Sequence, residues 1–267
     1  MLVHGTAMSD RRSTRCWGRI PETLRAMGAN VCFGRQDAWG STPTNVEQLK
    51  VSVDSALAAF GAEKVNIIAH SKGGLDSRAL ANLPEYAGKI ASITTVSTPH
   101  RGIGWLSKIW PFSFVFIVIA SGIFYPLLRL FPGDKKPNMY KLAKIMTKKG
   151  CEKFNAETPD NPNIFYQSFA GNMTPSSSGG IFFITRIAAN RFDGENDGLI
   201  PVETAKWGLF RGTLAGGGKR GLSHADEIDF FKRDFEGENV LSHDDETYTS
   251  VPEIYARIVN DLKSREL

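Results

Sequence analysis

Short apolar runs alternate with longer segments of helical periodicity along most of this chain. Residues 65–69 and 90–96 are uncharged and rich in β-branched side chains, which is the pattern of buried strands. In the segments that separate such runs, apolar residues recur every three or four positions, as in residues 44–60, a predicted helix that ends at Gly61. The alternation of strand and helix predicts an α/β fold with a doubly wound, mostly parallel sheet.

Other predicted elements extend this plan toward both ends of the chain. Residues 2–4, 30–33 and 164–169 are predicted strands, and residues 17–27 and 250–262 are predicted amphipathic helices. Thr44 with Glu47 has the spacing of a capping box, and Ser250 is placed to cap the last helix. The first strand is short for the middle of a sheet and no signal peptide precedes it, so we expect the native N-terminus to lie further upstream.

The composition narrows the class of protein. With 267 residues, 42% of them hydrophobic, the chain can bury one large core. We therefore expect a single domain over residues 1–267, with a lid or cap inserted at about 103–150. A net charge of +4, without basic and aromatic residues interleaved, excludes nucleic acid as an expected partner. Cys16, Cys32 and Cys151 form no CxxC motif and do not pair off evenly, so their spacing requires no disulfide.

Ser71 lies between a predicted strand and a predicted helix, in the sequence Ala-His-Ser-Lys-Gly-Gly at 69–74. This is the G-x-S-x-G pattern of a nucleophile elbow with Ala69 in the first place, a substitution that keeps the residue small. The tight turn needs small neighbours, and it holds the serine hydroxyl at a helix N-terminus, where backbone amides face a developing oxyanion. We therefore predict that Ser71 is a nucleophile; the alternative is an ordinary polar turn.

Two backbone amides are candidates for an oxyanion hole. In hydrolases with this elbow, one donor is the amide of the residue after the nucleophile, and the other comes from the loop after an earlier strand. The residue after the nucleophile is Lys72, and the earlier loop is His4-Gly5-Thr6, which directly follows the apolar Leu2-Val3. The sequence thus predicts the amides of Thr6 and Lys72 as the two donors.

A carboxylate and a histidine follow the elbow in the chain order of a Ser-Asp-His triad. Asp197 precedes an apolar Leu-Ile-Pro step, and His224 lies on a loop late in the chain. We predict Asp197 as the orienting acid and His224 as the base, although an acidic turn of this kind is often only a solvated or calcium-binding loop.

His100 follows the strand after the elbow and is predicted to be structural, while His243 lies in an acidic segment and is predicted to be on the surface.

The run 109–128 is apolar and contains no charged residue. Its length would allow a membrane span, but Pro111, Gly122 and Pro126, together with its position between core strands, favour a lid over an apolar active site. Several lysines follow it, which suits an anionic lipid surface. We expect a lid or interfacial segment; a membrane span and a core helix are the alternatives.

Taken together, these motifs resemble those of the Pseudomonas/Burkholderia type of bacterial triacylglycerol lipases. The similar blocks are LVHG at 2–5, VNIIAHSKGGLDSR at 65–78, TTVSTPHRG at 94–102, NDGLIPV at 196–202 and SHADE at 223–227. The resemblance implies an α/β-hydrolase fold, lipid ester substrates and a secreted or membrane-associated protein. The chain departs from the family at Ala69, in its unusually apolar lid and in its short first strand.

The resemblance also implies a structural calcium ion near the catalytic histidine, with Asp226 as one ligand. The partner carboxylate would have to be Asp193 or Glu195, because no acidic residue occurs from 161 to 192. Calcium takes about six to eight oxygen ligands, which one such carboxylate and carbonyl groups would struggle to supply. The alternative for Asp226 is a helix-start residue. No cofactor is expected for the chemistry itself.

The sequence therefore predicts a serine carboxylester hydrolase that cleaves acyl esters of lipids through an acyl-enzyme intermediate. Its expected partners are a lipid ester substrate and a lipid–water interface or membrane surface. One alternative is a phospholipase or lipid acyltransferase, which the same triad would serve. The other is a catalytically silent lipid-binding protein with a hydrolase fold.

Overall fold

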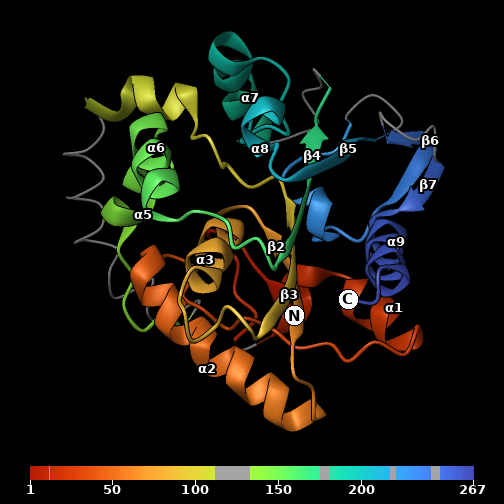
Figure 1. Cartoon of the computed structure of the whole chain (residues 1–267). Helices are drawn as coiled ribbons and strands as arrows, with labels where there is room; N and C mark the ends of the chain where they lie inside the picture. Colours follow the sequence, from red (N-terminus) through yellow and green to blue (C-terminus); the bar gives the residue numbers. More distant parts are fainter. Residues whose placement is uncertain (12, 112–132, 175–180, 217–220, 242–246) are drawn as a thin grey trace.

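Within the described residues, a sheet of seven strands, labelled β1 to β7 in their order across the sheet, forms the middle layer of this computed structural model (Figure 1). The structure describes residues 1–11, 13–111, 133–174, 181–216, 221–241 and 247–267. The strands are β1 (Leu2–Val3), β2 (Val65–His70), β3 (Ile90–Val96), β4 (Phe165–Asn172), β5 (Leu209–Ala215), β6 (Asp234–Leu241) and β7 (Thr247–Ser250). The first five strands pair in parallel, and β6 and β7 add an antiparallel edge. The predicted doubly wound, mostly parallel α/β fold is thereby confirmed.

The predicted strand at 30–33 is reduced to a single parallel bridge between Leu2 and Phe33. The Leu2 amide donates to the carbonyl of Cys32 (2.9 Å), and the Gly34 amide donates to the carbonyl of Leu2 (2.8 Å). This segment therefore lies on the outer side of β1, and the chain then crosses to the other side of β1 to form β2. Such a reversal of direction is a topological switch point, where the carboxyl ends of strands leave room for a site.

Helices cover both faces of the sheet, with α2 (Thr42–Phe60) and α3 (Lys72–Ala81) on one side and α1 (Ile20–Ala26) and α9 (Val251–Ser264) on the other (Figure 1). The elements outside the sheet are η1 (Thr14–Trp17), α1 (Ile20–Ala26), α2 (Thr42–Phe60), α3 (Lys72–Ala81), a helical stretch at 104–111, α5 (Met139–Ile145), α6 (Lys148–Glu157), α7 (Ile181–Asp193), α8 (Val202–Ala205), η3 (Asp226–Ile228) and α9 (Val251–Ser264). The sheet is therefore the central layer of three.

Alternate residues of the parallel strands face two separate apolar cores. Leu2 and Ile68 pack in the core that contains Trp17 and Tyr255, against α1 and α9. The neighbouring positions of the same strands contribute to the opposite core, which Ala69 shares with residues of α2 and α3. Because successive side chains of a strand point to opposite faces, burial on both sides explains the continuous apolar runs of these strands.

Of the two predicted helix starts, the one at Thr44 differs from the structure and the one at Ser250 agrees with it in position. Helix α2 begins at Thr42 with Ser41 as its N-cap, so the capping box predicted at Thr44 is wrong. Pro43 explains the earlier start, because a proline fits the first turn of a helix, where its missing N–H costs nothing. Ser250 is the N-cap of α9, as predicted, but its side chain makes no capping hydrogen bond. All three cysteines are free.

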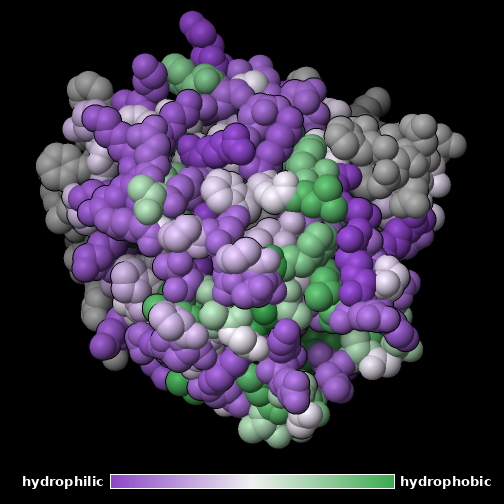
Figure 2. All heavy atoms as spheres, viewed as in Figure 1, coloured by the Kyte–Doolittle hydropathy of each residue, from purple (hydrophilic) through white to green (hydrophobic). Residues whose placement is uncertain are grey.

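The surface in view is mostly hydrophilic, and hydrophobic residues are densest right of the centre and toward the lower edge of that face (Figure 2). The predicted lid run 109–128 lies outside the described residues from position 112 onward. Within the ranges that the structure describes, no helix combines the length and the apolar character that crossing a membrane requires.

Candidate active site

Ser71 occupies a sharp turn between β2 and α3. Its backbone dihedral angles are φ 56° and ψ −134°, a region that residues other than glycine rarely adopt. The turn is held by hydrogen bonds on both sides, from the Ser71 amide to the carbonyl of Val96 (2.9 Å) and from the Thr98 hydroxyl to the carbonyl of Ser71 (2.7 Å). The serine hydroxyl is thereby fixed at the N-terminus of α3.

Small residues around Ser71 make this turn sterically possible. A Cβ on Gly73 would lie 2.5 Å from the carbonyl oxygen of His4, and a Cβ on Gly5 would lie 2.5 Å from the Cβ of Ser71. The loop after β1 therefore passes directly against the elbow, which neither position would allow with a larger residue. Ala69, which replaces the usual glycine, is fully buried, and the core beside α2 accommodates its methyl group.

The structure brings the three predicted triad residues together. His224 Nε2 lies 2.9 Å from Ser71 Oγ, and His224 Nδ1 lies 2.7 Å from Asp197 Oδ2. In the tautomer that this arrangement favours, Nδ1–H donates to the carboxylate and Nε2 accepts from the serine hydroxyl. All three side chains are buried. The geometry is that of a serine nucleophile beside a base that a carboxylate orients.

Asp197 is held in place by the turn in which it lies. Its Oδ1 accepts hydrogen bonds from the amides of Leu199 (2.8 Å) and Ile200 (2.7 Å), while Oδ2 faces His224. The backbone of the same residue accepts from the amide of His224 (2.9 Å). Since the carboxylate is fully buried, these donors stabilise its charge in place of water.

The two predicted oxyanion donors lie on either side of the elbow. Thr6 follows Gly5 in the loop that packs on Ser71, and Lys72 is the first residue of α3. Among the residues described, neither amide has a hydrogen-bond partner. Both N–H groups are therefore available to an acceptor placed next to Ser71 Oγ.

The Lys72 side chain has a role that the sequence reasoning missed. Its Nζ is buried and lies 2.7 Å from both carboxylate oxygens of Asp76, one turn further along α3. The side-chain amide of Asn45, from α2, donates to the same carboxylate (2.8 Å). A buried ion pair needs such extra partners, because its desolvation offsets much of the attraction. The pair ties the elbow helix to α2.

Glu227 is a second buried carboxyl group beside the triad, and it also was not predicted. Its Oε1 accepts from the hydroxyl of Ser97 (2.8 Å), and its Oε2 lies 3.8 Å from His224 Nδ1. Burial, and then the charge of Asp197, raise the pKa of Glu227 well above its usual range. Gly171 of β4 makes the room, since a Cβ there would overlap the Glu227 carboxyl group. The raised pKa favours the protonated, neutral form of the Glu227 carboxyl group.

His70 completes the buried cluster around the triad. Its ring centroid lies 4.4 Å from that of His224, and its Nε2 lies 3.4 Å from Glu227 Oε2. Burial, and then the proximity of His224, hold the pKa of His70 well below its usual range. A neutral His70 places no competing charge against His224.

The ring of His100 contacts residues other than the three of the triad. It is buried, stacks on Trp207 with ring centroids 5.1 Å apart, and contacts Arg78 and Thr95 through its two ring nitrogens. Burial, and then the charge of Arg78, hold the pKa of His100 well below its usual range. These contacts suit the structural role that we predicted. His243 lies outside the described residues.

The residues around Asp226 fit a calcium ion poorly. Asp226 Oδ2 accepts from the amide and the hydroxyl of Ser223 within the same turn. Asp193 instead accepts from the amide of Trp105 (2.9 Å) and lies 3.4 Å from Lys148 Nζ, and Glu195 is exposed. In the described ranges, the group of possible ligands that does come together is His70, His224 and Glu227, which belongs to the Ser71 site. Calcium binding stays an untested prediction.

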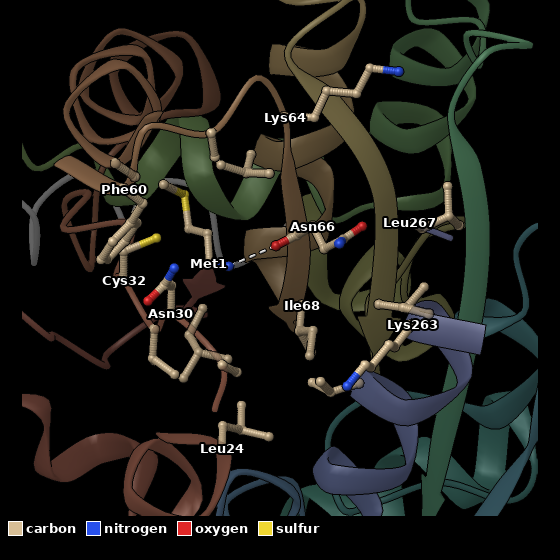
Figure 3. Close-up of a pocket in the computed structure, with 18 residues that line it drawn as sticks. Met1, Leu24, Asn30, Cys32, Phe60, Lys64, Asn66, Ile68, Lys263 and Leu267 are labelled. Carbon is tan, nitrogen blue, oxygen red and sulfur yellow. Dashed lines mark hydrogen bonds between the residues drawn. The ribbon is translucent and has the colours of Figure 1, made fainter. Parts of the chain in front are cut away.

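A cavity of about 290 Å³ lies at the opposite end of the sheet, where β1 and β2 begin. Met1, Cys32, Phe60 and Asn66 are among the side chains that line it, and the Met1 amino group donates to the carbonyl of Asn66 (2.6 Å; Figure 3). Ser71 follows the other end of β2, so this cavity is separate from the triad.

Curated relatives of this chain include several triacylglycerol lipases. The chain is 28% identical over 221 residues to triacylglycerol lipase 2 of Saccharomyces cerevisiae, covering 80% of this chain and 62% of that protein. It is 33% identical over 170 residues to a triacylglycerol lipase of Vibrio cholerae (60% and 54%), and 40% identical over 107 residues to one of Burkholderia plantarii (38% and 29%). The chain thus spans less than two thirds of each of these relatives. No protein-family profile matches it.

Solved structures agree on the fold. The metagenomic carboxyl esterase MGS0156 has a TM-score of 0.70 at 17% identity, covering 97% of this chain and 74% of that one. The mature Bacillus licheniformis lipase BlEst2 has a TM-score of 0.63 at 22% identity, covering 86% of each chain. The chain has the α/β-hydrolase fold. Its curated relatives confirm the resemblance to bacterial triacylglycerol lipases.

The neutral state of Glu227 can be tested through the pH dependence of stability. Its pKa is raised in the folded state, so the unfolded chain loses this proton first as the pH rises above the ordinary value of 4.5. Between that value and the folded-state pKa, wild type should lose up to about 1.4 kcal/mol of unfolding free energy per pH unit relative to Glu227→Gln, which cannot ionise. Urea unfolding of both proteins from pH 5 to 8 measures this. A difference that does not change with pH would contradict a raised pKa.

Proposed function

We propose that this chain is a serine carboxylester hydrolase. The observation that carries the proposal is the continuous chain of hydrogen bonds from Ser71 Oγ to His224 Nε2 (2.9 Å) and from His224 Nδ1 to Asp197 Oδ2 (2.7 Å). The amides of Thr6 and Lys72 beside the elbow have no hydrogen-bond partner within the described ranges, and they provide a place for an oxyanion. The names of the curated relatives point to the same class of reaction.

In the proposed mechanism, Ser71 Oγ attacks the carbonyl carbon of an ester while His224 Nε2 takes the hydroxyl proton. Asp197 orients the ring of His224 and stabilises the imidazolium that forms. The amides of Thr6 and Lys72 stabilise the tetrahedral oxyanion. His224 then gives the proton to the leaving alcohol, which leaves an acyl group on Ser71, and a water molecule activated by the same histidine releases the acid.

We infer that the acyl esters are those of lipids. Curated relatives of the chain are named triacylglycerol lipases. Helix α7 supports an interfacial role: Phe182 lies near His224, with ring centroids 6.5 Å apart, while Ile184 and Ile187 are 70% and 54% exposed. Exposed isoleucines one helical turn apart suit contact with a lipid surface. The lid at 109–128 and interfacial activation by it remain predictions, since that run lies largely outside the described residues.

Substitution of the triad tests the proposed reaction. Ser71→Ala, His224→Ala and Asp197→Asn should each lower kcat toward p-nitrophenyl butyrate by about 10⁴-fold or more, because each removes a group that acts in the transition state. Ser71→Ala should leave the urea midpoint unchanged, since it empties no core volume. His100→Ala is the matched control, a buried histidine whose ring contacts Arg78, Thr95 and Trp207 and no member of the triad, and it should lower kcat only a few-fold. Equal losses at His100 and His224 would contradict the assignment of the base.

The proposed lipid surface on α7 can be tested separately from the chemistry. Ile184→Asp with Ile187→Asp should reduce turnover of emulsified triolein by about tenfold or more, because a buried isoleucine contributes about 1.5–3 kcal/mol and a charge opposes its burial. Turnover of soluble p-nitrophenyl butyrate should stay within about twofold. Val51→Asp on α2, also at a strongly exposed apolar position, is the control and should change neither rate. Equal losses on both substrates in the α7 variant would refute a surface role.

A further inference from the structure

The loop that carries Thr6 is fixed on both sides of this residue. The carbonyl of His4 accepts from the side-chain amide of Gln36 (2.8 Å), and the carbonyl of Gly5 accepts from His4 Nδ1 (2.8 Å). After Thr6, the amide of Ala7 donates to the carbonyl of Ala38 (3.2 Å), and Ala7 itself has a positive φ of 63°. The backbone on either side of Thr6 therefore has its partners, and its position is set before any substrate binds.

This fixed loop lies against the nucleophile. Gly5 is packed so closely on Ser71 that an added Cβ would be 2.5 Å from Ser71 Cβ and 3.1 Å from Ser71 Oγ. Thr6 is the next residue, and within the described part of the chain its amide donates to no acceptor. Thr6 thus directly follows the residue that packs on the reacting serine.

The Thr6 hydroxyl is also without a partner. Its oxygen is shielded from solvent and makes no hydrogen bond to any described residue. A buried hydroxyl gives up its bonds to water, so folding leaves such a group unpaired at a cost, and native proteins do so rarely. At Thr6, unlike at other such positions, the hydroxyl lies one residue from the contact with Ser71, so a bound substrate can supply the missing partner. Next to Ser71, the partner that arrives is an ester carbonyl oxygen.

We propose that Thr6 Oγ1 is a third donor of the oxyanion hole, in addition to the amides of Thr6 and Lys72. This inference rests on the proposed hydrolase function. A threonine hydroxyl rotates to suit its acceptor, and its hydrogen bond strengthens as the carbonyl oxygen gains negative charge. The donor stays on Thr6 throughout, so no proton is transferred. The interaction is stronger in the transition state than in the ground state, which is the condition for an effect on kcat.

Thr6→Val and Thr6→Ser separate the hydroxyl from the shape of the side chain. Valine keeps the branched shape and removes the donor, and it should lower kcat toward p-nitrophenyl butyrate by about 10²–10³-fold with KM nearly unchanged. Serine keeps the donor and should stay within about tenfold of wild type. Thr6→Ala, compared with Thr6→Ser, gives the same contrast if valine disturbs folding. Thr42→Val is the matched control, because the Thr42 hydroxyl is also buried and has no partner among the described residues, but Thr42 lies at the start of α2; the substitution should leave kcat unchanged.

A trifluoromethyl ketone provides a second readout, because its adduct with Ser71 carries a tetrahedral oxyanion. The inhibition constant should rise in Thr6→Val by a factor similar to the loss in kcat, and it should change little in Thr6→Ser. Equal kcat values and equal inhibition in Thr6→Val and Thr6→Ser, with an active wild type, would overturn the third donor and leave the hydrolase intact. Failure of the hydrolase proposal looks different: wild type itself would turn over no ester and would form no adduct.

Discussion

Ser71 has a backbone conformation, φ 56° and ψ −134°, that costs a residue other than glycine about 1–3 kcal/mol, and the arrangement of the site depends on it. Three hydrogen bonds from the surrounding structure hold the backbone of this turn in place. Val96 at the end of β3 accepts from its amide, Thr98 donates to its carbonyl, and the amide of Gly74 closes the first turn of α3 on the same carbonyl. The strained conformation directs the Ser71 hydroxyl out of the sheet and toward His224.

The same turn determines the electrostatics of the site. Residues on either side of Ser71 belong to a water-poor cluster, in which His70 contacts His224 and Lys72 pairs with Asp76. Two carboxyl groups close to His224 cannot both carry a charge in such surroundings. Asp197 has two backbone amide donors on one oxygen and His224 on the other, whereas Glu227 has the neutral hydroxyl of Ser97. The better-solvated carboxyl group is therefore Asp197, which faces the base, whereas burial and the proximity of Asp197 raise the pKa of Glu227 and favour its protonated form.

The sequence allowed the triad to be predicted because each member lies in a local pattern. A strand, a serine and two glycines define the elbow, and the order of Asp197 and His224 follows from the chain itself. Glu227 shows the limit of such reasoning. It lies three residues after His224, but its burial depends on Ser97 after β3 and on the missing side chain of Gly171 in β4. Likewise, the four-residue spacing of Lys72 and Asp76 predicts an ion pair along a helix. Its burial depends on the packing of α2, which places Asn45 against the Asp76 carboxylate, and the sequence does not show that packing. The strand at 30–33 was predicted too long because no local signal shows how short β1 is.

Covalent labelling of the folded protein with a fluorophosphonate, followed by peptide mass spectrometry, tests the central claim that this turn creates a nucleophile. We expect one phosphonate per chain, attached to Ser71, because only a serine with a positioned base and oxyanion donors reacts rapidly with this reagent. The His224→Ala protein, with its fold checked by circular dichroism, should be labelled far more slowly at the same position. Labelling of another serine, or an unlabelled Ser71 in a protein that still hydrolyses esters, would contradict the account.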